Sequence, residues 1–310
     1  MKVRAGIGTF AAAAFAALAV AGDDAKTYDI DAHEHWTAKQ VVTFTDHETS
    51  DMDMKVGGKS MHAEQSVLDA VYSVRCDEAD DKGEPTKRTV FVKSWKETKN
   101  GKSDESITGA LVTVTGNEWK LAPGKTAGNL AGKWLDATFG KKDMGNPLAK
   151  VAPTKLKVGE TWKADPKVVA EAFASELEDA PFDASKTTME LTLESAEGTP
   201  PDASGKLSFK AHLPISSMPH MPPHATLHDG AGAELTGTRT GPLTKSTMVG
   251  VSHMDFTLKV DLDMQTPNGA MTAESGGKMV KDRTAVAGGE IPEQKPPTAK
   301  APPAAPDGGK

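Results

Sequence analysis

The stretch "STMVGVSHMDFTLKVDLDMQT", residues 246–266, decides the fold class of this chain. Its apolar residues share one parity: Met248, Met254, Phe256, Leu258, Val260, Leu262 and Met264. Its polar residues share the other: His253, Asp255, Thr257, Lys259, Asp261, Asp263 and Gln265. Side chains of a β-strand point to opposite faces with a period of two. The stretch therefore predicts a long strand with one apolar face and one wet face.

Shorter runs predict further strands. They occupy residues 51–56, 70–76, 88–95, 110–115, 188–194 and 206–213. The dipeptide Gly116-Asn117 follows one of these runs and predicts a two-residue hairpin turn. Clusters of Gly, Asp, Lys and Pro separate the runs. This pattern is typical of an antiparallel meander.

Two mid-chain segments have a helical period instead. In the first, Asp165 is an N-cap, Pro166 fits the first helical position and Pro181 ends the helix. Its apolar residues recur every four positions, at Val169, Phe173 and Leu177. The second helix is expected within residues 126–139, with an apolar stripe at Leu130, Trp134, Leu135 and Phe139. We therefore predict a mainly β fold, in which a strongly curved antiparallel sheet or incomplete barrel has its concave face plugged by two short helices.

The two ends of the chain predict export and a tail. Residues 1–21 read as a signal peptide, because Lys2 and Arg4 precede a short apolar run and the pattern Ala19-Val20-Ala21. No cysteine stands near the cut, which excludes a lipidated N-terminus. Residues 287–310, rich in Pro, Ala and Lys, predict a disordered tail. Between them we expect a β-rich domain over residues 22–286, or alternatively two halves, 22–150 and 151–286.

Charge and cysteine content restrict the partners. The formal net charge is -7, so nucleic acid and anionic membrane surfaces are poor partners. Cys76 is the only cysteine, and no internal disulfide can form. It shares the parity of Tyr72 and Val74, which indicates a buried, inert thiol. We expect an exported, soluble protein, periplasmic or extracellular, without stable membrane insertion after signal cleavage.

Two segments, residues 150–165 ("KVAPTKLKVGETWKAD") and 232–250 ("GAELTGTRTGPLTKSTMVG"), give the chain a family resemblance. The chain resembles exported β-rich bacterial proteins of unknown function. In layout it is also distantly similar to half-barrel lipoprotein carriers. The resemblance implies that something apolar binds in the concavity, and the missing lipidated cysteine fits a soluble carrier. It supplies no catalytic residue.

The stretch "SMPHMPPHATLHD", residues 217–229, raises the question of a metal site. Thioether and imidazole ligands together suit copper, and imidazole alone also accepts zinc. The candidate ligands are Met218, His220, Met221, His224 and His228. The alternative is a surface loop, stiffened by its three prolines, with solvated histidines and with methionines at the edge of the core. The sequence leaves both open.

No catalytic motif is present in the sequence. There is no Gly-x-Ser-x-Gly elbow, and residues 56–60 and 100–103 do not make a phosphate-binding loop. The leading hypothesis is therefore a non-enzymatic exported protein that binds an apolar small molecule or an envelope partner protein. A copper- or zinc-binding protein is the second hypothesis. A hydrolase with an unrecognised site is the third.

Overall fold

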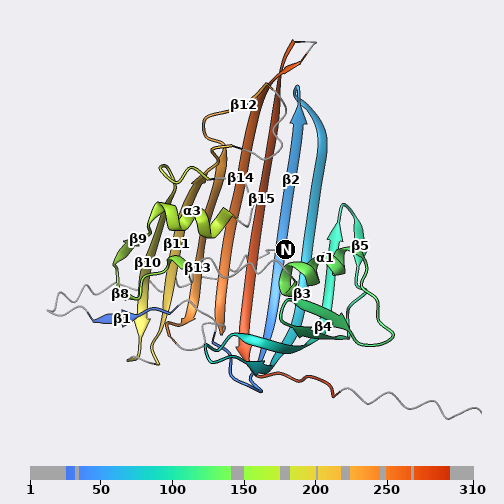
Figure 1. Ribbon diagram of the computed structural model, residues 1–310, viewed down its shortest axis with the longest axis vertical. Coiled ribbons are helices and arrows are strands. Elements are labelled where there is room, and N and C mark those ends of the chain that lie inside the picture. Colours follow the sequence, from blue (N-terminus) through green and yellow to red (C-terminus); the bar gives the residue numbers. More distant parts are fainter. Residues whose placement is uncertain are drawn as a thin grey trace, which may run out of the picture.

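The alternating stretches of the sequence form one large antiparallel sheet (Figure 1). The structure is a computed structural model that describes residues 26–31, 35–140, 150–174, 182–199, 202–217, 224–244, 249–266 and 269–293. The strands are β1 (Thr27–Asp29), β2 (Val41–Val56), β3 (Lys59–Ala79), β4 (Pro85–Lys99), β5 (Lys102–Asp104), β6 (Ala110–Thr115), β7 (Glu118–Leu121), β8 (Lys155–Lys157), β9 (Thr161–Lys163), β10 (Thr188–Glu197), β11 (Ser204–Pro214), β12 (Ala225–Leu227), β13 (Gly232–Pro242), β14 (Gly250–Thr266) and β15 (Gly269–Ala287). The helices of the described residues are α1 (Asn129–Phe139) and α3 (Pro166–Ala174).

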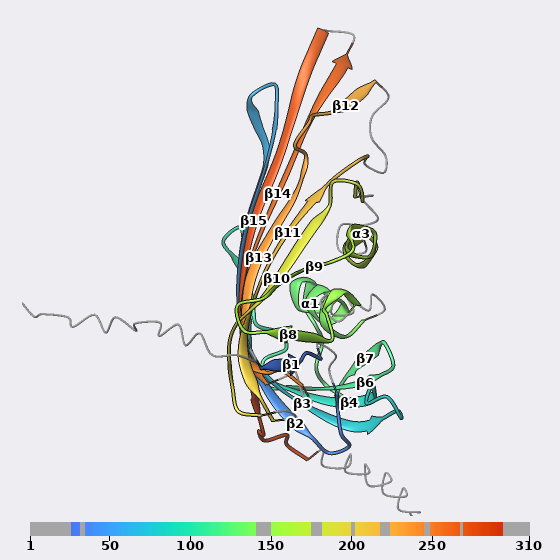
Figure 2. The same cartoon turned by 90° about the vertical axis from the view of Figure 1, so that its left-hand side faces the viewer.

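The main sheet has 13 strands and stays open at both edges. Its main path runs β7-β6-β4-β3-β2-β15-β14-β13-β11-β10-β9, with β5 added to β4 and β12 added to β14. The four longest strands, β2, β3, β14 and β15, lie at its centre. Figure 2 shows that the sheet is strongly curved and that both helices lie on its concave side. The predicted fold class is confirmed.

The individual elements follow the sequence patterns closely. Residues 246–266 contain β14, and the six shorter alternating runs all lie within strands. Gly116 has a φ of 55° in the turn between β6 and β7, which glycine adopts without steric cost. Helix α3 begins at Pro166, and an Asp165 side-chain oxygen accepts hydrogen bonds from the backbone N–H groups of Lys167 (2.9 Å) and Val168 (3.2 Å). The predicted continuation to Pro181 lies outside the described residues.

Helix α1 covers the N-terminal half of the concave face. Trp134, Leu135 and Phe139 pack with Tyr72 and Trp95 in one buried cluster. The Tyr72 and Trp134 rings meet edge to face, with centroids 5.3 Å apart. Cys76 belongs to the same cluster and is fully buried. Burial raises the pKa of the Cys76 thiol, and the charge of Asp77 raises it further, so the thiol stays protonated, as the sequence predicted.

Asp104, at the end of β5, fixes the start of α1. One of its carboxylate oxygens accepts a hydrogen bond from the Ala131 N–H at 3.2 Å. The carboxylate lies so close to Gly128 that a Cβ there would come within 2.3 Å of an oxygen. Gly128 is therefore required for this cap, which comes from another element of the chain.

Helix α3 covers the C-terminal half of the concave face in the same way. Val169 and Phe173 pack with Met189, Ala211 and Leu213 in a second buried cluster. A third cluster joins the small sheet of β1 and β8 to β10 and β11. Each half of the main sheet therefore has its own helix and its own core. The halves meet where β15 pairs with β2.

A buried ion pair crosses this seam. Arg283 of β15 donates two hydrogen bonds to Asp46 of β2, from Nε at 2.8 Å and from Nη2 at 2.7 Å. The Tyr72 hydroxyl of β3 donates a third at 3.2 Å, and Asp46 is only 3% exposed. Burial raises the pKa of Asp46, but the hydrogen bonds and charge of Arg283 outweigh burial and hold the pKa below its usual value.

Replacing Asp46 by asparagine tests the seam. We expect Asp46→Asn to lower the free energy of unfolding at pH 7 by about 2–3 kcal/mol, because a largely buried Arg283 loses its counter-charge. A carboxylate with a lowered pKa stabilises the fold above its unfolded pKa, near 3.9, and loses that effect as pH falls through the lowered value. The deficit should therefore shrink below about pH 4. Urea denaturation at several pH values measures it, with Glu48→Gln at the more exposed neighbouring pair as control. An equal deficit at all pH values would contradict the assignment.

Candidate functional site

The concave face continues beyond both helices, toward the hairpins that end β2 and β14 (Figure 2). Register places the apolar parity of β14 on this side, together with the partners of these residues on β15 and β2. We call these side chains the distal concave face. They are Met52, Met54, Val56, Leu258, Leu262, Met264, Met271 and Ala273.

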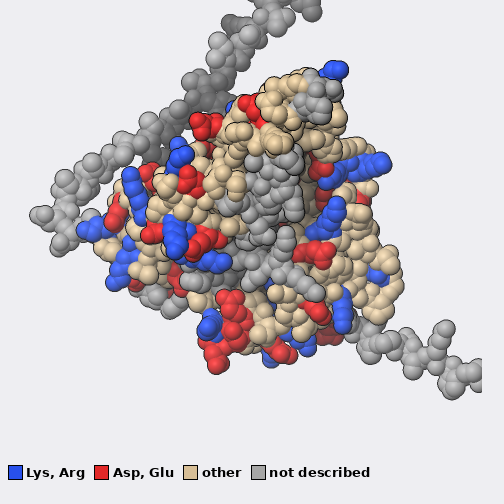
Figure 3. All heavy atoms as spheres, turned by 45° about the horizontal axis from the view of Figure 1, so that its top comes forward, with Lys and Arg blue, Asp and Glu red and all other residues tan. Residues whose placement is uncertain are grey.

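Several residues of the distal concave face are exposed. Met52 is 43% exposed, Met54 40% and Met271 36%. None of the three belongs to a buried cluster within the described residues, whereas Leu258 and Leu262 pack partly against the core under α3. Figure 3 shows the hairpin end of the molecule turned forward, with uncharged residues prevailing over the upper part of the view. The exposed methionines of β2 and β15 therefore form an apolar surface that is not buried, and it is bordered on β3 by Glu64 and His62, which lie in register with Met52 and Met54.

The opposite face of the same strands is polar. Asp51, Asp53 and Lys55 alternate with the exposed methionines of β2, and Asp261 and Asp263 alternate with the leucines of β14. A strand exposed to water on both faces does not require apolar residues at alternate positions. The apolar parity thus extends into a region that the described core does not use.

A charged band separates the buried core from the distal concave face. It contains the Asp46–Arg283 pair and the pair of Lys281 with Glu48, whose nitrogen and oxygen lie 3.2 Å apart. Glu97 on β4 lies in the same region of the concave side, in register with Leu68 of β3. Burial raises the pKa of Glu97, and the nearby acids Glu48 and Asp104 raise it further. On β2 and β15 the band marks where close packing of the sheet ends, whereas on β14 Val260 beyond it is still buried.

The methionine- and histidine-rich segment is only partly described. Met218, His220 and Met221 lie outside the described residues. His224 is exposed with a φ of 65°, and it precedes β12, which pairs with β14. His228 follows β12, and its Nε2 lies 2.7 Å from an Asp263 oxygen. The structure thus brings His228 to a carboxylate.

Across the described ranges, no three or more His, Cys, Asp or Glu side chains are grouped so as to hold a metal ion. That finding does not reach Met218, His220 and Met221. The copper or zinc site of the five residues therefore stays a prediction.

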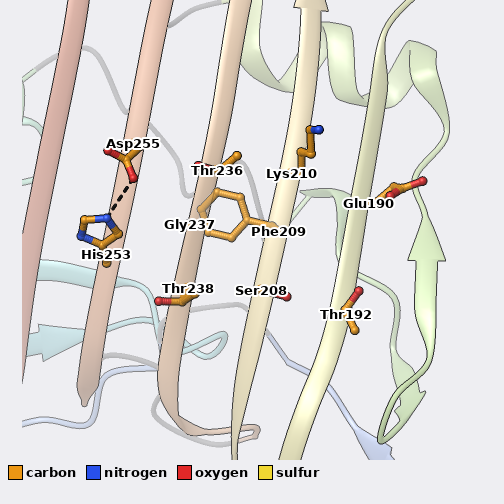
Figure 4. A pocket seen from close by; sticks show the side chains of 10 residues that line it. All are labelled: Glu190, Thr192, Ser208, Phe209, Lys210, Thr236, Gly237, Thr238, His253 and Asp255. Carbon is orange, nitrogen blue, oxygen red and sulfur yellow. Dashed lines mark hydrogen bonds and ion pairs between the residues drawn. The ribbon is translucent and has the colours of Figure 1, made fainter.

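The outer face of the sheet carries a hollow of about 410 Å³ over β10, β11, β13 and β14 (Figure 4). It is lined by Glu190, Thr192, Ser208, Phe209, Lys210, Thr236, Gly237, Thr238, His253 and Asp255. His253 Nε2 lies 2.9 Å from an Asp255 oxygen, and His253 Nδ1 lies 2.7 Å from an Asp282 oxygen of β15. The hydrogen bond with Asp282 and then that with Asp255 raise the pKa of His253. The two carboxylates favour the imidazolium, which is a poor general base.

Sequence reasoning assigned His253 and Asp255 to the wet face correctly. It missed their joining to Asp282, which lies 29 positions from His253 and becomes its neighbour only through the register of β14 and β15. A polar residue on a wet parity gives no signal of its cross-strand partner.

Comparisons with known proteins identify no family. No family model and no curated protein match the chain. A solved structure of lipovitellin, described by its lipid–protein interactions, superposes with a TM-score of 0.35 at 8% identity over 84% of this chain. The chain spans only 26% of that lipovitellin chain. An outer membrane channel from Pseudomonas putida F1 has a TM-score of 0.21 at 7% identity, covering 82% of this chain and 97% of the channel. Scores this low carry no argument about function.

The helices give one further finding. Neither α1 nor α3, the helices of the described ranges, is long and apolar enough to cross a membrane.

Metal content tests the methionine- and histidine-rich segment. The copper or zinc hypothesis predicts about one equivalent of metal per chain, and its loss when His220 and His224 are both replaced by alanine, because each removes an imidazole ligand. Elemental analysis of untagged protein measures it. His47→Ala, which removes a histidine paired with Asp69 on the outer face, is the control and should keep the metal. Less than about a tenth of an equivalent in the unaltered protein would contradict a resident metal.

Proposed function

We propose that the protein is an exported, non-enzymatic binding protein that takes an apolar ligand on the distal concave face. The observation that carries the proposal is the exposed row of Met52, Met54 and Met271 on the concave side, beyond the helices and the charged band. Contiguous exposed apolar surface on a globular protein is typical of an interaction site.

Methionine suits such a surface because its side chain is flexible and polarisable. It adapts to apolar partners of varied shape. Met52 already leans over β15, where a Cβ at Gly277 would come within 3.1 Å of its Cγ. The absence of a side chain at Gly277 gives Met52 room to lie flat or to turn outward. A face of this kind accommodates an acyl chain or a similar apolar body.

The free energy gained by covering the three methionines alone is too small for tight binding, so the ligand must contact more of the distal concave face. Full burial of a methionine contributes about 1.5–3 kcal/mol, and each of the three has already lost more than half of its exposure. Covering the remainder contributes about 2–3 kcal/mol in total. A useful affinity therefore requires contact with Leu258, Leu262 and Met264 as well. An apolar segment of an envelope partner protein meets the same requirement and is the alternative ligand.

Charge placed on the distal concave face tests the proposal. We expect the double variant Met52→Asp, Met54→Asp to weaken binding of the neutral fluorophore N-phenyl-1-naphthylamine by about tenfold or more, because each carboxylate must be desolvated against the probe. Fluorescence titration measures it, with circular dichroism to verify folding. The matched control Asp51→Asn, Asp53→Asn changes the opposite face of the same strand and should leave binding unaltered. Equal binding by both double variants would show that the distal concave face is not the binding site.

Export is the second part of the proposal, and it rests on the signal-like residues 1–21. We expect the mature protein, expressed with its full N-terminus in a bacterial host, to begin at Gly22. N-terminal sequencing and intact mass of the extracellular and envelope fractions measure the cut. Replacing the apolar residues Phe15 and Leu18 by Asp should keep the protein uncleaved in the cytoplasm. A full-length protein found only in the cytoplasm of the unaltered strain would contradict export.

A further inference from the structure

A second hollow lies on the outer face of the N-terminal half, on the opposite side of the sheet from the α1 core. Its volume is about 820 Å³, within the size range of small-molecule sites. Residues Val41, Arg75, Phe91 and Lys93 form its floor on β2, β3 and β4. Residues 289–292, which follow β15, form its wall. We call residues 288–293 the strap.

Two glycines hold the strap against the sheet. The Gly288 N–H donates to the Val41 carbonyl at 2.7 Å, and the Thr43 hydroxyl donates to the Gly288 carbonyl at 2.8 Å. A Cβ at Gly289 would lie only 2.2 Å from the Thr43 hydroxyl oxygen and 2.8 Å from that of Ser73. Gly289 also has a φ of 137°, which other residues rarely adopt. The strap can therefore approach the sheet this closely only with glycine at this position.

The lining of this hollow includes apolar side chains. Val41, Phe91 and Ile291 are all partly buried, and Pro292 adds apolar surface at the rim. Elsewhere the outer parity of β2, β14 and β15 consists mainly of Asp, Glu, Lys, Thr and His. An apolar floor of this size beneath a wall from the same chain provides contact area for a flat or branched organic body.

Two of the four floor residues are cations, Arg75 and Lys93. Arg75 donates from Nε to an Asp77 oxygen at 2.7 Å and from Nη2 to the Thr89 hydroxyl at 3.5 Å, so Nη1 is the nitrogen of the guanidinium that remains for another acceptor. Lys93 is exposed, and within the described ranges it forms no ion pair. The acid in the lining is Glu290 of the strap. A ligand anion between Arg75 and Lys93 would complete this arrangement of charges.

We propose that this hollow binds an organic anion, with its carboxylate, sulfonate or phosphate group between Arg75 and Lys93 and its apolar body against Phe91 and Ile291. The site is independent of the distal concave face. The chain's own tail, residues 294–310, follows the strap in sequence and carries Lys295, Lys300 and Lys310 against Asp307. The net positive charge of the tail is repelled by the two cations of the hollow, so an external anion is the better occupant.

Paired naphthalene probes test the charge requirement on the full chain. We expect naphthalene-2-sulfonate to bind about tenfold more tightly than the neutral naphthalene-2-sulfonamide, measured by isothermal titration calorimetry, because only the anion gains charge-assisted hydrogen bonds. Lys93→Gln should remove most of this difference without altering the weak sulfonamide affinity. The matched control Lys210→Gln removes an exposed cation from the other outer hollow and should change neither. Equal affinities for the two probes, or a sulfonate affinity unaffected by Lys93→Gln, would overturn the proposal.

Three further variants locate the probe. Gly289→Ala should weaken both probes, because the strap must move away from Thr43 and Ser73. The double variant Met52→Asp, Met54→Asp should leave sulfonate binding intact, and a loss there would place the probe on the distal concave face instead. A chain ending at Glu293 should bind sulfonate as the full chain does. Clearly tighter binding by this shortened chain would make the tail the native occupant and overturn the assignment to an external anion.

Discussion

The pairing of β15 with β2 is the constraint on which the rest of the structure depends. Asp46 and Arg283 stand 237 positions apart in the chain, and their bidentate, largely buried contact fixes the register of the two strands. A shift of one strand by one residue would turn its side chain to the opposite face of the sheet and separate the pair. Because each half of the sheet has its own core, the pairing of β15 with β2 is what joins the two halves into one curved sheet. The distal concave face exists only across it, since its methionines come from β2 on one side and from β14 and β15 on the other.

The two faces of the sheet perform different physical tasks. The concave face changes along the strands from packed core, through a charged band, to exposed methionine and leucine. The outer face is held by cross-strand pairs of opposite charge, such as His253 with Asp282 and His47 with Asp69. Where the strap crosses this face, Val41 and Phe91 add apolar surface to it. The proposed ligands therefore differ in chemistry because the two faces differ in what they leave exposed.

Much of the fold was predictable because it is encoded locally. The parity of β14 and the cap at Asp165 need only neighbours along the chain. Strand β15 was not named in advance, because its apolar residues Met271 and Met279 share a face with Gly277 and Lys281, and Gly276-Gly277 interrupts the strand pattern. Its structure comes from pairing on both sides with long strands, which overrides a weak local preference. For the site, parity predicted an apolar concave side but not where packing stops. The strap hollow depends on Gly289 meeting Thr43 and Ser73, a contact between distant positions that no spacing reveals.

The position of β15 also has a consequence for the order of assembly. Strand β15, the last in the chain, lies in the middle of the sheet. During synthesis β2 therefore remains an unpaired edge of the N-terminal half until residues 269–287 have been made. During that interval the edge has Asp51, Asp53 and Lys55 along its wet side, and such charges discourage pairing with a foreign strand. Contacts of such large sequence separation also slow folding, because the whole intervening chain must be brought together first. The sheet thus reaches its final form only after nearly the entire polypeptide is available.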